Sequence, residues 1–250
     1  MRTVGVDLAA EAACTAIAVV EWHAGTAAVV ELEFPADDAA VLRHAHGADK
    51  VGIDCPLGWP DAFVEFLRTQ RADPAGIATD LPGAAWRRSL AYRRTDERVR
   101  SLCGMVPLSV ATDRIGVTAM RAVRLQALLA QRGHRLDRAG TGLIVEVYPA
   151  AGLKHWQLPF RRYKGSKNLA ALGTLIDTLR EAAPWLDFGA HEGLCRQRDH
   201  AADAVLAALL ARAAACGLTI QPAATERAAA ESEGWIALPT CTLGDLVRSA

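Results

Sequence analysis

Acidic side chains end three of the strands that the sequence predicts. Asp7 closes the run Arg2-Thr-Val-Gly-Val-Asp7, Asp54 closes Val51-Gly-Ile-Asp54, and Glu146 lies in Leu143-Ile-Val-Glu146-Val-Tyr-Pro. In an open α/β sheet, the carboxyl ends of the strands form the edge where ligands bind. Two carboxylates about 4 Å apart repel by roughly 4 kcal/mol at an effective dielectric constant of 20, so converging acids need a cation between them. We therefore expect Asp7, Asp54 and Glu146 to bind one or two divalent ions, Mg²⁺ or Mn²⁺.

A fourth acidic group lies on a predicted helix, in the segment Asp199-His200-Ala-Ala-Asp203. Residues three and four positions apart share one face of a helix, so Asp203 shares a face with His200 or with Asp199. We predict Asp199 and Asp203 as further metal ligands. His200 is predicted to be catalytic, as a ligand or as a proton carrier, because its charge changes near neutral pH.

Each of these residues also has an ordinary structural explanation. Asp7 could cap a turn, Asp54 could be a solvated strand end, and an inward Glu146 could pair with an arginine. Asp199 could be the N-cap of its helix, a common role for aspartate. Asp203 fits that explanation less well, since it lies one turn further inside an otherwise apolar, Ala-rich segment.

The elements that position these residues follow from hydrophobic periodicity and turn residues. The pattern predicts strands at 2–8, 14–22, 27–34, 50–54 and 142–147, and helices at 37–46, from 61 to 70, and at 117–132, 168–182 and 200–216. Three consecutive strands followed by alternating helices and strands are typical of the ribonuclease H-like fold. We thus predict an α/β protein with a mixed five-stranded core sheet, three strands antiparallel and two parallel, flanked by helices.

The segment between the fourth strand and the long helix is rich in Pro and Gly from residue 72 to residue 113. It is too long for an ordinary connection between two elements. We predict an irregular insertion at about 72–116 that covers the site, within a single domain spanning residues 1–250.

Global composition excludes few functions. Lys+Arg and Asp+Glu both total 28, so the net charge of zero gives no overall indication of nucleic acid. Six cysteines without a CxxC pair argue against a zinc ribbon and indicate reduced thiols in a cytoplasmic protein. We expect no signal peptide and no membrane association, since the longest Ala/Leu-rich stretch, 201–218, is interrupted by Asp203 and Arg212.

Positive charge is concentrated in two stretches. Residues 87–100 contain Arg87, Arg88, Arg93, Arg94, Arg98 and Arg100, and residues 154–167 interleave Lys154, Arg161, Arg162, Lys164 and Lys167 with Trp156, Phe160 and Tyr163. Cations interleaved with aromatic rings suit phosphate backbones and unstacked bases, although a run of charges is also typical of a solvated surface. The predicted partner is nucleic acid, and the predicted substrate-binding residues are Arg93, Arg94, Arg98 and Lys164.

Six strings along the chain carry a family resemblance. They are Gly5-Val-Asp7-Leu, Ile53-Asp54-Cys-Pro-Leu-Gly58, Tyr92-Arg-Arg-Thr-Asp96, Val145-Glu146-Val-Tyr-Pro149, Tyr163-Lys164-Gly and Glu233-Gly-Trp-Ile. In this order, from about residue 2 to residue 239, the chain resembles the family catalogued as domain of unknown function 429. That family is described as predicted nucleases with a ribonuclease H-like fold.

The segment from Asp199 to Asp203 also resembles the closing helix of bacterial Holliday-junction resolvases, in which an acid or His stands three positions before an Asp. Resolvases usually have a Glu where Asp54 stands. They offer no counterpart for the segment from Arg93 to Asp96, so Asp96 either orients a neighbouring arginine or approaches the metal site.

These features predict a metal-dependent nuclease that hydrolyses phosphodiester bonds through a carboxylate-bound ion. The predicted catalytic residues are Asp7, Asp54, Glu146, His200 and Asp203. One alternative is a non-catalytic module that binds nucleic acid or a protein partner. The other is a nucleotide phosphotransferase of the actin-like superfold, whose Gly-rich phosphate turns have no equivalent in Asp7-Leu-Ala-Ala-Glu-Ala-Ala.

Overall fold

The centre of the molecule is a mixed sheet. A computed structural model describes residues 1–77 and 80–248. Its six strands have the order β5-β4-β1-β2-β3-β6. They are β1 (Arg2–Asp7), β2 (Ala16–His23), β3 (Thr26–Glu33), β4 (Lys50–Ile53), β5 (Ile144–Glu146) and β6 (Leu186–Asp187).

The first three strands pair antiparallel, and β4 and β5 extend the sheet in parallel from β1. The predicted count of five strands is wrong, because β6 pairs in parallel with β3 at the other edge. A strand of two residues is too short to produce an alternating apolar pattern.

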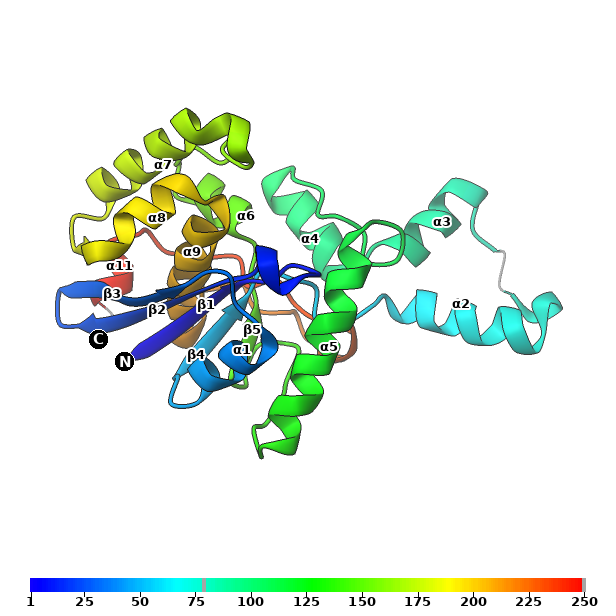
Figure 1. The fold of residues 1–250 in the computed structure, drawn as a ribbon. Coiled ribbons are helices and arrows are strands. Elements are labelled where there is room, and N and C mark those ends of the chain that lie inside the picture. The colour runs from blue at the N-terminus through cyan, green and yellow to red at the C-terminus, as the bar shows by residue number, and fades with distance from the viewer. Residues whose placement is uncertain (78–79, 249–250) are drawn as a thin grey trace.

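Helices cover both faces of the sheet (Figure 1). On one face lie α1 (Asp38–Ala45) and α5 (Ile115–Gln131); on the other lie α6 (Pro149–His155), α7 (Leu169–Ala182), α8 (Glu192–Gln197) and α9 (Asp199–Ala215). The remaining helices are α2 (Asp61–Ala72), α3 (Gly83–Ala91), α4 (Arg94–Cys103), α10 (Arg227–Glu233) and α11 (Asp245–Arg248). Within the described ranges, no helix has the length and apolar character needed to cross a membrane.

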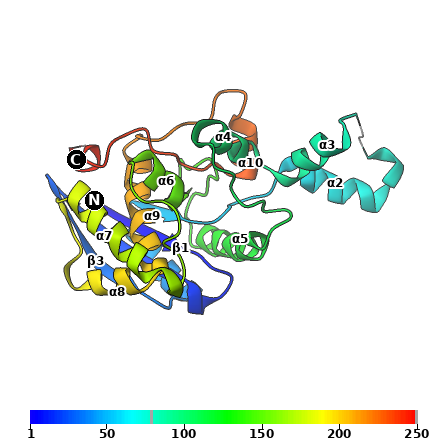
Figure 2. The same cartoon turned by 90° about the horizontal axis from the view of Figure 1, so that it is seen from above.

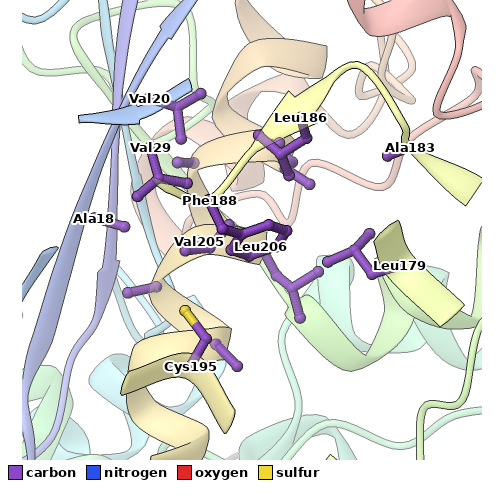
Figure 3. Close-up of a cluster of buried hydrophobic side chains, with 14 of the residues drawn as sticks. Ala18, Val20, Val29, Leu179, Ala183, Leu186, Phe188, Cys195, Val205 and Leu206 are labelled. Atoms are coloured by element: carbon purple, nitrogen blue, oxygen red, sulfur yellow. The ribbon is translucent and has the colours of Figure 1, made fainter. Parts of the chain in front are cut away.

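Alternating side chains of the central strands divide the core into two layers. In β2, Val20 packs toward α7 and α9, whereas its neighbour Val19 packs toward α1 and α5. Figure 3 shows part of the first layer, in which Val20 lies with Val205 and Leu206 of α9. Because α9 lies between the sheet and α7 and α8, its residues from Ala201 to Ala213 are all buried.

Two glycines let α9 lie directly on the sheet. Gly5 of β1 and Gly52 of β4 are paired in register. A Cβ atom on Gly5 would lie 2.0 Å from the carbonyl oxygen of Ala204, and one on Gly52 would lie 2.5 Å from that of Ala207. No side chain fits between β1, β4 and the helix backbone at these points. The N-terminal turns of α9 therefore lie against the carboxyl ends of both strands.

The predicted irregular insertion instead contains two helices, α3 and α4. Helices α2 and α3 pack against each other, with the rings of Phe66 and Trp86 edge to face at 5.7 Å, and they project from the body of the protein (Figures 1 and 2). The prediction of irregular structure is wrong because the breaking residues lie between helices. Pro82 precedes α3 and Gly104 ends α4 in the left-handed conformation.

Replacing Gly5 by Ala tests the close approach of α9. We expect Gly5→Ala to lower the free energy of unfolding by about 1–3 kcal/mol, because its methyl group displaces backbone rather than a side chain. Gly193→Ala is the control, since nothing lies within 4 Å of its added Cβ. Urea unfolding measures the free energy of unfolding of both variants. Equal stabilities for the two variants would contradict the packing described.

Candidate metal centre

Three aspartates meet at the carboxyl edge of the sheet. Asp7 is the last residue of β1, Asp54 follows β4, and Asp203 lies one turn into α9. The backbone N–H of Asp54 donates to the carbonyl of Val6 at 2.9 Å, which continues the strand pairing and brings Asp54 level with Asp7. One carboxylate oxygen from each aspartate lies within 4.8 Å of the others. Three of the predicted ligands are thus close enough to share a metal ion.

The three carboxylates differ in their protein partners. Asp203 accepts a hydrogen bond at Oδ1 from the hydroxyl of Tyr163 at 2.8 Å, and its Oδ2 lies 2.6 Å from the ammonium of Lys164. Oδ2 of Asp7 lies 2.6 Å from Nδ1 of His200. Among the described residues, none forms a hydrogen bond or an ion pair with the carboxylate of Asp54. Asp54 therefore offers carboxylate oxygens that no direct protein contact occupies.

Burial and mutual repulsion shape the acidity of the cluster. Burial raises the pKa of Asp203 to about 6; Lys164 opposes the rise and the charge of Asp7 adds to it. Burial likewise raises the pKa of Asp54 well above its usual range, again with Lys164 opposing. The hydrogen bond to Asp7 raises the pKa of His200. A cation bound among these oxygens would relieve the repulsion.

The cluster borders a cavity of about 330 Å³, within the range of small-ligand sites. Its other lining residues include Leu8, Pro56, Pro107, Leu108, Ile115, Tyr148 and Ile236. Pro107 and Leu108 lie between α4 and α5, so the insertion supplies one wall. Leu108 is 60% exposed at this wall. The cavity thus combines an acidic face with a largely apolar wall.

Glu146 is paired with Arg93. The two side chains are 2% and 1% exposed by residue, and two hydrogen bonds of 2.8 and 2.7 Å join the guanidinium to the carboxylate. Oε2 of Glu146 also accepts from the backbone N–H of Leu57 at 3.0 Å. Asp96 binds the same guanidinium through both of its oxygens. The structure therefore follows the arginine alternative for Glu146, and Asp96 orients Arg93.

Glu233 connects this buried network to two helix N-termini. Its Oε1 accepts from the backbone N–H of Asp61 at 2.9 Å and its Oε2 from that of Arg94 at 2.8 Å. These N–H groups begin α2 and α4 and have no partner within their own helices. Gly234 follows with a φ of 98°, and a Cβ there would lie 2.8 Å from Oε2 of Glu146. The insertion is thus fastened to the sheet edge by buried carboxylates.

The predicted substrate-binding residues lie in three different environments. The guanidinium of Arg93 is buried and bound by carboxylates, as described above. Arg94 and Arg98 are exposed on α4. Lys164 contacts the aspartate cluster and lines the cavity. Of the four, Lys164 is the one that contacts the three-aspartate cluster.

Asp199 and His200 lie at the start of α9. Asp199 accepts a hydrogen bond from the backbone N–H of Gly165 at 2.9 Å, so its carboxylate holds the segment that carries Lys164. The ring of His200 stacks on Phe34, with centroids 5.8 Å apart and an interplanar angle of 18°.

Sequence reasoning missed two contacts at this site. The sequence gives Tyr163 no role beyond an aromatic in a basic stretch and a place in a family string, yet its hydroxyl holds Asp203. Glu233 was noted only for its family resemblance. The available signal was the presence of both residues in short family strings that lacked an assigned role.

The fold and the site define an α/β protein with an aspartate cluster suited to a metal ion at the sheet edge. The chain belongs to the family described as protein of unknown function (DUF429), whose sequence profile matches residues 5–227. The matched region includes the three aspartates and the Arg93–Glu146 pair. No curated protein and no solved structure matches the chain.

Replacing Arg93 by Met tests the buried network. The substitution leaves Glu146 and Asp96 without their shared cation, so we expect the free energy of unfolding to fall by about 3–5 kcal/mol. Arg94→Met is the matched control: it keeps the backbone N–H that Glu233 binds, and its exposed side chain should matter by less than about 0.5 kcal/mol. Urea unfolding measures the free energy of unfolding of the two variants. A loss below about 1 kcal/mol for Arg93→Met would refute the assigned role.

Proposed function

We propose that the protein is a metal-dependent nuclease with a ribonuclease H-like fold, which hydrolyses phosphodiester bonds in nucleic acid. The observation that carries the proposal is the convergence of Asp7, Asp54 and Asp203, with ligand oxygens within 4.8 Å of one another. The strand order supports the fold assignment, because three consecutive antiparallel strands are followed by two strands that extend the sheet in parallel from β1.

The donor set fits Mg²⁺ or Mn²⁺, which prefer carboxylate oxygens. Asp54 can bind an ion without losing a protein contact, and the partners of Asp7 and Asp203 orient those carboxylates. A bound ion of this kind activates water and stabilises charge on phosphate oxygens. Glu146 supports the site through Arg93 in this proposal, rather than binding the ion.

The chain's own residues supply positioning and proton transfer. His200 fixes the carboxylate of Asp7 through Nδ1, which leaves Nε2 as the ring atom that can hold or release a proton. Tyr163 holds Asp203 in place. The ammonium of Lys164 lies at the cavity, where a phosphate group would meet the ion.

A nucleic-acid substrate agrees with the rest of the cavity. Its apolar wall and the ring of Tyr148 suit a base, and the exposed Arg94 and Arg98 suit a phosphate backbone. We also propose a cytoplasmic location, since Cys14, Cys55, Cys103, Cys195 and Cys241 form no disulfide.

Thermal unfolding tests the metal site. With Mg²⁺ at a hundred times its dissociation constant, we expect about 2.7 kcal/mol of stabilisation and a Tm about 5–10 °C above that in EDTA. Asp54→Asn should remove most of this difference, because it removes a ligand and no protein contact. The exposed Glu181→Gln should behave as wild type. A Tm that is the same in EDTA, Mg²⁺ and Mn²⁺ would count against the site.

Cleavage assays test the activity. Labelled single-stranded, duplex, hybrid and four-way-junction substrates are incubated with Mg²⁺ or Mn²⁺ and the wild-type protein. We expect cleavage of at least one substrate class, and a rate at least about a hundredfold lower for Asp7→Asn and Asp203→Asn. Glu181→Gln is again the control. Tight binding without cleavage, unaffected by metal and by Asp7→Asn, would favour the non-catalytic module.

A further inference from the structure

Both carboxylate oxygens of Asp203 are already in contact with protein groups. Tyr163 donates to Oδ1 at 2.8 Å, and the ammonium of Lys164 lies 2.6 Å from Oδ2. An ion bound by Asp203 must share or displace one of these contacts. The hydroxyl of Tyr163 is neutral and compatible with an ion on the same carboxylate, whereas the ammonium competes for the same negative charge.

Lys164 is the partner that can leave. Tyr163 is 1% exposed and belongs to the hydrophobic core, so its ring is held in place. The side chain of Lys164 is 53% exposed, so it can move into solvent or the cavity without breaking core packing. The segment beyond it is anchored independently, because Asp199 binds the backbone N–H of Gly165.

The charge of Lys164 acts on the whole cluster. Burial lowers the pKa of Lys164, but the carboxylates of Asp203, Asp54 and Asp7 outweigh burial and raise it overall. In this structure the lysine therefore provides part of the positive charge that a metal ion would otherwise bring. It also lines the cavity in which a substrate phosphate would bind.

We propose that Lys164 is an exchangeable counter-ion: it neutralises the aspartate cluster when no metal is bound, and metal binding frees its ammonium to contact the substrate phosphate. This inference rests on the proposed function, since it takes a metal ion and a phosphodiester as ligands of one site. It makes metal binding and phosphate binding mutually supportive, because the ion releases the residue that then holds the substrate.

The proposal predicts two opposite effects of removing the charge. In Lys164→Met the three carboxylates repel one another with only His200 left to offset their charge, so the metal-free protein loses stability. A metal ion then meets no competing cation, so it binds more tightly. A lysine that merely stabilised the ligand geometry would give the opposite second effect, since its loss would weaken metal binding.

The test compares wild type with Lys164→Met, Lys164→Arg and the control Lys167→Met, an exposed lysine three positions away. Isothermal titration calorimetry measures Mn²⁺ binding and thermal unfolding in EDTA measures metal-free stability. For Lys164→Met we expect about tenfold tighter Mn²⁺ binding and a Tm in EDTA lower by about 5 °C. Lys164→Arg keeps the charge and should stay near wild type, as should Lys167→Met.

Two failures are distinguishable. Wild type that binds Mn²⁺ while Lys164→Met binds it equally or more weakly overturns the exchange and leaves the metal site standing. No Mn²⁺ binding by any of the four proteins overturns the proposed function and the exchange together.

If Lys164→Met does not fold, amine labelling of the wild type tests whether metal binding releases Lys164. Acetylation by acetic anhydride is read by mass spectrometry against Lys50, Lys154 and Lys167, the other lysines of the chain. We expect Mg²⁺ to increase labelling of Lys164 several-fold and to leave the others unchanged. Unchanged labelling of Lys164 overturns the exchange.

Discussion

The close contact between α9 and the two central parallel strands is the constraint on which the site depends. Gly5 and Gly52 remove side chains from this contact, and alanines on α9 keep the helix backbone near the sheet. A larger residue at either glycine would move α9 outward, and Asp203 with it. The metal centre is therefore a consequence of packing: Asp7 and Asp54 are set by strand register, and Asp203 reaches them because the helix can approach so closely.

Two sets of carboxylates lie at the same sheet edge and are balanced in different ways. The carboxylate of Glu146 is bound by Arg93 and that of Glu233 by two backbone N–H groups, so their burial is compensated within the protein. The aspartates have an excess of negative charge that Lys164 and His200 offset only in part. Charge compensation thus separates the acids that hold the insertion in place from those available to a ligand, although the two kinds look alike in the sequence.

The sequence predicts the parts of this site whose signal lies in neighbouring residues, and it does not predict the parts that depend on residues far apart in the chain. The central strands and α9 have clear periodicity, and strand ends identify the edge where Asp7 and Asp54 meet. The partner of Glu146 had no local signal, because Arg93 lies 53 positions away and stood in a run that resembled a phosphate-binding surface. Helices α3 and α4 were missed because their bounding Pro and Gly residues predicted irregular structure over the whole segment. Strand β6 depends on its tertiary contact with β3 and has no pattern of its own.

The position of Glu233 in the chain has a consequence for biosynthesis. It binds backbone groups that precede it by 172 and 139 positions. As the chain leaves the ribosome, α2 and α4 emerge well before the carboxylate that binds their first N–H groups. Asp7, Asp54 and Asp203 all precede Glu233 in the chain and are therefore synthesised before it. An incomplete chain that stops before Glu233 therefore contains every expected metal ligand while α2 and α4 still lack the carboxylate that binds their first N–H groups.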